Sequence, residues 1–278
     1  MNAFLLLFCG SVMSFFIEKS YNKNLQKTTL SDSIILMQKV EKSVDIIEQM
    51  FNAGAHYGYS KTRRHPSVSK YIYTTKKKTD IIDLEQTSVL LSLATEFVKT
   101  LGSNNKVVLF VGTKPEAKEI IKNAALSLDM PYVTERWIGG TLSNFSEIKK
   151  RIAELENYQK ESLAGELNKY TKKERVVLSK KMERLSKYYG GLLNLKKAPD
   201  ALFIIDPKAE KIALTEGFKS GIPIVALANS DSNIKNINYP LIGNDTGIPS
   251  ISFFTKMIKE AYKQGVDLNP TNEIEKKI

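Results

Sequence analysis

The feature that most limits the fold of this chain is an alternation of short apolar runs with segments of helical character. Residues 107–111 form a continuous apolar run rich in β-branched residues, which is typical of a strand buried on both faces of a parallel sheet. Similar runs occur at 132–133, 202–205, 222–227 and 239–242, and helical patterns occur at 115–128, 208–219 and 248–263. This alternation predicts an α/β fold: a parallel sheet flanked by helices in three layers, as in flavodoxin-like or Rossmann-like domains.

Residues 143–189 interrupt the alternation. Two helical patterns, at 143–161 and 171–189, are joined by a short loop around Gly165. Their apolar stripes are narrow and their other faces are crowded with Lys, Arg and Glu, as in a two-helix coiled hairpin that projects into solvent. The predicted globular domain therefore comprises residues 37–142 and 190–265, with the hairpin inserted between them.

The two ends of the chain are predicted to lie outside this domain. Residues 1–36 form an apolar and then polar extension that we expect to be poorly ordered, and residues 266–278 form a C-terminal tail. No Lys or Arg precedes the apolar run, no small-residue cleavage site follows it, and it is short for a membrane span. The pattern favours a dispensable extension, with an export signal or a membrane anchor as the alternative.

Positive charge is concentrated in two parts of the chain. The sequence holds 41 Lys and Arg against 30 Asp and Glu, a formal net charge of +11. Residues 51–79 contain seven basic and no acidic side chains, and residues 143–189 carry a net charge of +5. This distribution favours a polyanionic partner over general solubility. The single cysteine, Cys9, excludes an intrachain disulfide framework and a thiolate zinc site.

An enzyme is the alternative interpretation of such a sheet. Gly112 and Thr113 follow a predicted strand and precede a helix, a position where doubly wound folds bind phosphate. However, the sequence contains neither G-x-G-x-x-G after this strand nor G-x-x-x-x-G-K-[ST], and no G-x-S-x-G accompanies the two histidines. We therefore predict no catalytic residues, and keep a nucleotide-binding or small-molecule-binding enzyme that uses the Gly112 end of the sheet as the alternative.

A metal site is expected to be absent. Asp206, Asp231 and Asp245 each follow a predicted strand, and their oxygens are ligands that a divalent cation accepts. Aspartates after buried strands more often form turns or caps. We therefore predict no cofactor, with a divalent cation at these three residues as the weaker alternative.

Positive evidence in the sequence favours RNA. In residues 54–78 basic side chains alternate with aromatic rings, which pairs phosphate neutralisation with stacking surfaces. The predicted phosphate ligands are Arg63, Arg64, Lys70, Lys76, Lys77 and Lys78, with His56 and Tyr57 as ring contacts or as groups that set the loop. A second predicted contact at the base of the hairpin comprises Arg136, Trp137, Lys149, Lys150 and Arg151, although core packing explains the tryptophan equally well.

Six motifs carry a resemblance to a known family. They are Ala53-Gly54-Ala55-His56-Tyr57-Gly58, Ile81-Ile82-Asp83-Leu84, Leu109-Phe110-Val111-Gly112-Thr113-Lys114, Arg136-Trp137-Ile138-Gly139-Gly140-Thr141-Leu142-Ser143-Asn144-Phe145, Pro199-Asp200-Ala201-Leu202-Phe203 and Gly243-Asn244-Asp245. In order and spacing they resemble the bacterial small-subunit ribosomal protein S-two family, over roughly residues 40–265.

The resemblance implies a structural role in translation without catalysis. It implies a cytoplasmic protein bound to small-subunit ribosomal RNA near the junction of head and body and close to other small-subunit proteins, including the S-one protein. We expect no DNA partner, no membrane attachment and no homo-oligomer.

The chain also departs from the family pattern. After Arg63 and Arg64 the family usually has Trp-Asn-Pro and several lysines, whereas this loop is one residue shorter and lacks the tryptophan. Asn229 replaces an acidic residue, which weakens any cation site.

Overall fold

The computed structural model describes residues 44–164 and 171–268. Of the two compact units in the chain, residues 1–46 and 47–278, the second contains both sheets. The larger sheet has the strand order β5-β4-β6-β7-β8 and every neighbouring pair is parallel. Its strands are β4 (Val108–Val111), β5 (Tyr132–Val133), β6 (Ala201–Ile205), β7 (Ile224–Ala228) and β8 (Tyr239–Ile242). The predicted parallel sheet is therefore confirmed.

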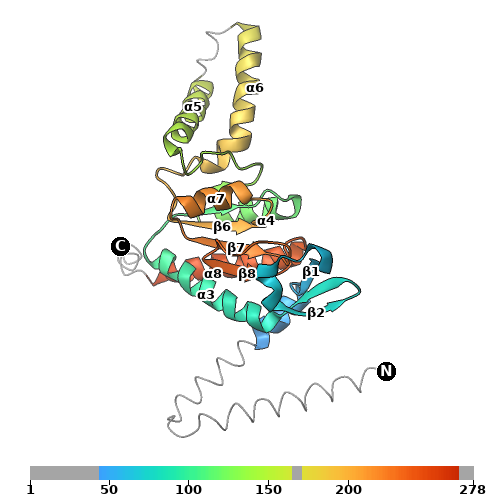
Figure 1. Cartoon of the computed structure of the whole chain (residues 1–278). Coiled ribbons are helices and arrows are strands. Elements are labelled where there is room, and N and C mark those ends of the chain that lie inside the picture. The colour runs from blue at the N-terminus through green and yellow to red at the C-terminus, as the bar shows by residue number, and fades with distance from the viewer. Residues whose placement is uncertain (1–43, 165–170, 269–278) are drawn as a thin grey trace, which may run out of the picture. The chain divides into compact units, whose positions relative to one another are not determined.

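Helices cover both faces of this sheet, and every residue of β4, β6 and β7 is buried as a result. One face packs against α3 (Leu84–Ser103), α4 (Pro115–Leu126) and α8 (Ile248–Asp267), and the other against α7 (Lys211–Lys219). Figure 1 shows α7 on one side of β6 and β7, with α3 and α8 on the other. The predicted three-layer α/β arrangement is confirmed.

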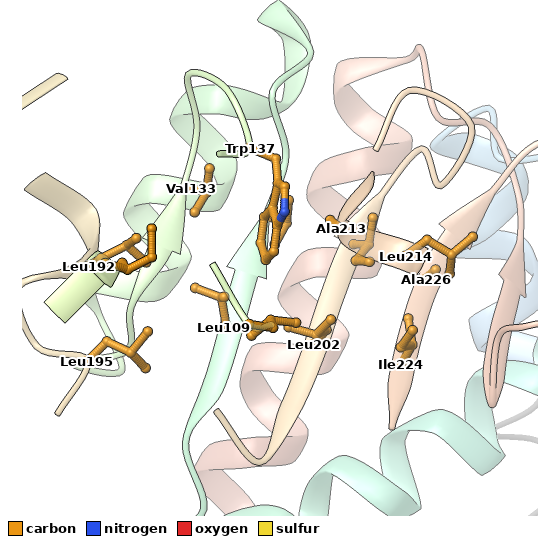
Figure 2. Close-up of a cluster of buried hydrophobic side chains, with 14 of the residues drawn as sticks. Leu109, Val133, Trp137, Leu192, Leu195, Leu202, Ala213, Leu214, Ile224 and Ala226 are labelled. Atoms are coloured by element: carbon orange, nitrogen blue, oxygen red, sulfur yellow. The ribbon is translucent and has the colours of Figure 1, made fainter. Parts of the chain in front are cut away.

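The α7 face of the sheet also holds the base of the helical hairpin. The hairpin consists of α5 (Phe145–Leu163) and α6 (Lys172–Tyr189), followed by η4 (Gly190–Leu192). Ile148 and Ile152 from α5 join the same buried cluster as Trp137 and Leu202, part of which Figure 2 shows. The narrow apolar stripe of α5 is thus anchored in the core of the sheet. Both helices lie within two residues of the predicted bounds, 143–161 and 171–189.

A second, antiparallel sheet precedes the parallel one. Its strands are β1 (Tyr57–Ser60), β2 (Ile72–Lys76) and β3 (Thr79–Ile82), in the order β1-β3-β2, with the short helices η1 (Lys61–Arg63) and η2 (Pro66–Tyr71) between β1 and β2. We call residues 57–82 the basic sheet. The strand β1 is not among the strands predicted from the sequence. Its residues, Tyr-Gly-Tyr-Ser, lack the apolar alternation that marks a strand.

Several predictions about the ends fall outside the described residues. The extension of residues 1–36 is among them, as is most of the tail of residues 266–278, although α8 continues to Asp267. Residues 44–52, at the start of the described part, are helical. No helix in the described part of the chain is both long and apolar enough to cross a membrane.

The helices α3 and α8 approach each other closely where two glycines meet. A Cβ atom on Gly265 would lie 2.1 Å from the carbonyl oxygen of Lys99 and 2.9 Å from the Cα of Gly102. A Cβ on Gly102 would lie 2.3 Å from the carbonyl oxygen of Tyr262. The backbones therefore touch at this crossing, which leaves no room for a side chain.

We predict that Gly265→Ala lowers the free energy of unfolding by about 2 kcal/mol, because the added methyl group forces the two helices apart. Chemical denaturation measures the change. Gly190→Ala is the matched control, since residue 190 has φ −57° and its Cβ would meet nothing nearer than Ser186 Oγ at 3.6 Å. Equal losses in the two variants would contradict the prediction.

Candidate nucleic-acid interface

The basic sheet is organised around one buried ion pair. Asp80 in β3 is fully buried, and its carboxylate accepts hydrogen bonds from Arg64 Nε at 2.7 Å and from the Arg64 terminal nitrogen. The same guanidinium donates to Thr75 Oγ1 at 2.7 Å. Hydrogen bonds from Arg64 hold the pKa of Asp80 below its usual value, against the opposite effect of burial. Arg64 thus links β3 to β2, and its guanidinium is occupied by Asp80 and Thr75 rather than free to bind a phosphate as predicted.

The other basic side chains of this sheet are exposed and lack an acidic partner among the described residues. They are Lys61, Arg63, Lys70, Lys76, Lys77 and Lys78. Because Asp80 is the one acidic residue of the basic sheet and is taken by Arg64, nothing within the sheet neutralises them. All the phosphate ligands predicted in this segment except Arg64 are therefore exposed and unpaired among the described residues, and Lys61, which was not among the predicted ligands, joins them.

The tip of this sheet holds two lysines in an unfavourable backbone conformation. Lys76 pairs with Thr79 across a two-residue turn, and the turn residues Lys77 and Lys78 have φ values of 49° and 66°. Two positive φ values are typical of a type I′ turn, in which Asn-Gly is preferred. Lysine in the left-handed region costs about 1 kcal/mol per residue, so the turn keeps its charge at the expense of stability.

Aromatic rings lie among these cations. The guanidinium of Arg63 lies 5.8 Å from the ring centroid of Tyr59, and Lys70 Nζ lies 4.8 Å from that of Tyr71. Tyr73 on β2 is 77% exposed. Of these three rings Tyr71 is buried and Tyr59 is half-buried, so Tyr73 is the one that offers an open stacking surface on the same sheet as the unpaired cations.

His56 is buried and stabilises the loop that precedes β1; it is not part of the exposed surface. Its ring stacks on Phe51, with centroids 4.6 Å apart, and packs against Tyr57 at 4.0 Å, while its carbonyl oxygen accepts the Ile82 amide. The residue is 8% exposed, and burial lowers the pKa of its imidazole. Of the two roles predicted for His56 and Tyr57, the histidine therefore fits the structural one, whereas the half-exposed Tyr57 ring remains a candidate ring contact.

The second predicted cluster, at the base of the hairpin, is only partly available. Trp137 is 4% exposed and packs in the core beside Val133 and Leu109 (Figure 2), so its prediction as an RNA contact is wrong. Lys150 is paired with Glu147 at 2.6 Å and Arg151 with Glu154 at 3.2 Å. The exposed cations of this cluster that have no such partner in the described part of the chain are Arg136 and Lys149.

A carboxylate from another helix fixes the turn that leads into this hairpin. Glu216 of α7 accepts the Gly140 amide at 2.7 Å and the Leu142 amide at 3.0 Å, one with each oxygen. Gly140 has a φ of 93°, which only glycine adopts readily. Glu216 was not singled out in the sequence, because nothing local links residue 216 to residues 140–142.

The positive charge of the hairpin lies on its second helix. The helix α5 contains four basic and four acidic residues, whereas α6 contains seven basic and two acidic ones. Lys181 is bound to Glu154, but four exposed cations of α6 have no ion-pair partner among the described residues: Lys172, Lys173, Lys180 and Arg184. Net charge along the sequence did not separate the two helices, so the prediction selected residues on the neutral one.

Charged side chains also meet at the carboxyl edge of the parallel sheet. Lys114, which follows β4, lies 2.6 Å from Asp206 Oδ2 and 2.7 Å from Asp245 Oδ2. Burial would lower the pKa of Lys114, but its hydrogen bonds to the two carboxylates outweigh burial and raise it. Asn229 Nδ2 donates to the other oxygen of Asp245 at 2.8 Å.

The three aspartates named as cation candidates therefore have other partners. Asp206 and Asp245 share the Lys114 ammonium, and Asp231 pairs with Lys208 at 2.7 Å. Within residues 44–164 and 171–268 no group of three or more His, Cys, Asp or Glu is arranged to hold a metal ion. The oxygen ligands that a divalent cation needs are here bound to ammonium groups.

The Gly112 end of the sheet, where the alternative enzyme would bind phosphate, is closed by side chains of the chain itself. The hydroxyl of Thr113 donates to the carboxylate of Glu210, which is 4% exposed, and burial raises the pKa of that carboxyl. A buried carboxyl group beside the first turn of α4 opposes an anionic ligand.

The same edge anchors the basic sheet. The Tyr59 amide donates to Ser230 Oγ at 2.9 Å and the His65 amide to the Ser230 carbonyl at 2.8 Å. The Asn244 amide donates to the Ala55 carbonyl at 3.0 Å. The loops after β7 and β8 thus hold the chain in place just before the basic sheet, at Ala55, and within it, at Tyr59 and His65.

Comparisons with known proteins agree on one family. The model of the family "Ribosomal protein S2" matches residues 50–265. The small ribosomal subunit protein uS2 of Helicobacter hepaticus is 39% identical over 82% of this chain and 87% of its own length. The protein of the same name from Wolinella succinogenes is 39% identical over 82% of this chain and 84% of its length. That from Bdellovibrio bacteriovorus is 38% identical over 79% and 70%.

We predict that Arg64→Ala lowers the free energy of unfolding by about 3 kcal/mol at neutral pH, because it leaves the buried Asp80 carboxylate without its ion-pair partner. The folded state depresses the pKa of Asp80, so this pair stabilises the protein above the ordinary value of 3.8 and the contribution disappears as the pH falls below it. Denaturation across that range measures the loss. Arg63→Ala is the control and should change stability little; similar losses in the two variants would refute the role of Arg64.

We predict that Glu210→Gln stabilises the protein relative to wild type, and increasingly so as the pH rises above 4.5, the ordinary pKa of the group. Burial raises the pKa of Glu210 in the folded state, so the wild-type protein loses stability as the pH rises through this window, whereas glutamine stays neutral. Unfolding at about pH 5 and about pH 7 measures the difference. The control is Glu119→Gln on the exposed side of α4, and a pH-independent difference at position 210 would contradict the prediction.

Proposed function

The chain belongs to the ribosomal protein S2 family, and we propose on this basis that it is a structural constituent of the small ribosomal subunit that binds ribosomal RNA and neighbouring proteins. The family match covers residues 50–265, which include both sheets and the hairpin. The chain is not an enzyme; its relatives carry the name of a ribosomal protein.

The observation that carries the RNA proposal is the set of exposed cations on the basic sheet that pair with no carboxylate within residues 44–164 and 171–268. Lys61, Arg63 and Lys70 lie beside the strands, and Lys76, Lys77 and Lys78 form the tip of the β2–β3 hairpin. Six cations on a small rigid platform suit the phosphates of a folded RNA. The strained turn supports the same proposal, since its two lysines reduce the stability of the fold.

A second proposed contact lies on the hairpin. Here the ligands are Arg136 and Lys149 at its base together with the unpaired cations of α6, in place of Lys150 and Arg151. The helix α6 presents Lys173, Lys180 and Arg184 on the face opposite its buried Met182. Such a row is suited to follow an RNA backbone.

The remaining partner assignments are also proposals. From the resemblance we propose the S-one protein among the neighbours, a cytoplasmic location on the ribosome, and no DNA, membrane or homo-oligomer partner. We also propose that the chain needs no cofactor, which is supported by the ammonium group of Lys114 between Asp206 and Asp245.

We predict that the double variant Lys77→Asn with Lys78→Gly is more stable than wild type by about 1 kcal/mol and binds small-subunit ribosomal RNA more weakly. The new residues favour the type I′ turn, and the loss of two phosphate contacts reduces the slope of log K against log salt by up to about two units. Filter binding over a range of salt concentrations, together with denaturant unfolding, measures both effects.

Lys122→Asn with Lys263→Asn is the matched control, because it removes the same charge from exposed positions on α4 and α8. The control should keep most of the wild-type slope. If both double variants lower the slope equally, the basic sheet is not the interface and binding reflects overall charge alone.

A further inference from the structure

The helix α3 exposes aliphatic side chains on the face that does not pack against the fold. Val89 is 60% exposed and Leu93 is 52% exposed. At 3.6 residues per turn they lie one turn apart on one face. We call this face the α3 ridge; it comprises Glu85, Val89, Ser92, Leu93, Glu96 and Thr100, all exposed. The buried stripe of α3 lies on the other side: Leu84, Thr87, Leu91, Ala94, Val98, Leu101 and Gly102. Packing within the described residues therefore does not explain why Val89 and Leu93 are apolar.

The apolar surface continues from the α3 ridge onto the edge of the parallel sheet. Phe97, one turn after Leu93, is half-buried and stacks on Tyr239 with ring centroids 4.2 Å apart and an interplanar angle of 14°. Tyr239 begins β8, the edge strand. Val89, Leu93 and the stacked pair form an oblique apolar strip that spans a helix and a strand.

The charge of the α3 ridge is opposite to that of the rest of the chain. Glu85 and Glu96 flank the two aliphatic side chains, and neither carboxylate has an ion-pair partner among the described residues. The one basic residue of α3, Lys99, is half-buried and lies about 80° around the helix from Val89. The α3 ridge therefore offers no basic side chain that could bind a phosphate, although the chain as a whole has a net charge of +11.

We propose that the α3 ridge is a docking surface for a segment of another protein that presents an apolar side chain between basic ones. Burial of aliphatic side chains against apolar protein groups is favourable, and two carboxylates attract Lys and Arg. Phosphates are repelled by the same carboxylates, so RNA does not fit this face. The inference rests on the proposed function, since the segment belongs to a neighbouring protein of the small subunit.

The test uses the full chain assembled into small ribosomal subunits. The photoreactive residue benzoylphenylalanine replaces Leu93 in one variant and Leu126, which is 57% exposed on α4, in the control. After irradiation and ribonuclease digestion, mass spectrometry identifies the crosslinked peptides. We expect position 93 to crosslink at least about tenfold more than position 126, to a segment of another ribosomal protein that contains Lys or Arg.

Charge reversal tests the proposed complementarity. Glu85→Lys with Glu96→Lys should lower the crosslink yield from position 93 about tenfold. The matched control, Glu116→Lys with Glu119→Lys on exposed sites of α4, should leave it unchanged. Thermal unfolding of each variant checks that the fold is retained.

Three results would overturn the inference: crosslinks from position 93 to RNA, crosslinks to a second copy of this chain, or equal yields from positions 93 and 126. Co-sedimentation with small subunits separates these failures from that of the proposed function. If the wild-type chain sediments with the subunit but position 93 crosslinks to no protein, only the α3 ridge assignment fails. If the wild-type chain does not sediment with the subunit, both fail.

Discussion

The structure depends on the partly buried ammonium of Lys114, which holds three separate parts of the chain together. Lys114 follows β4, Asp206 follows β6, and Asp245 lies between β8 and α8. Asp206 has a φ of 60° and also accepts the amides of Lys208 and Ala209, so its carboxylate fixes the start of the segment that leads into α7. Removing one partner from such a buried pair typically costs about 3–5 kcal/mol. The edge of the sheet where α/β enzymes bind ligands is thus used here for internal cohesion.

That edge also explains how a sheet of polar, exposed residues keeps its shape. The basic sheet has little core of its own, but Val68, Tyr71 and Ile82 pack against Ala228 and Ile242 at the ends of β7 and β8. With Arg64 held by Asp80, the remaining cations project from a fixed platform. A preorganised set of charges loses less conformational entropy on binding than a flexible tail would.

Most of the sheet was predictable because β4, β6 and β7 are continuous apolar runs, and the hairpin because its stripes have helical spacing. The helix α3 was not predicted, although its sequence carries the signal of a helix: Asp83 caps its first turn, and Leu84, Leu91, Ala94, Val98 and Leu101 recur at helical intervals. The lysine turn was not predictable, because its two central positions hold Lys77 and Lys78 instead of the Asn and Gly that mark a type I′ turn.

The sequence by itself determined the family, the order of strands and helices, and the two regions of excess positive charge, because these depend on local composition and spacing. It could not decide which charges are available. Arg63 and Arg64 are adjacent and chemically identical, yet one is exposed and the other is bound to an aspartate 16 residues away. Trp137 is likewise buried among residues distant in the chain, such as Leu202 and Ile224. Availability is a property of pairing and burial, and both arise only when the tertiary structure brings the partners together.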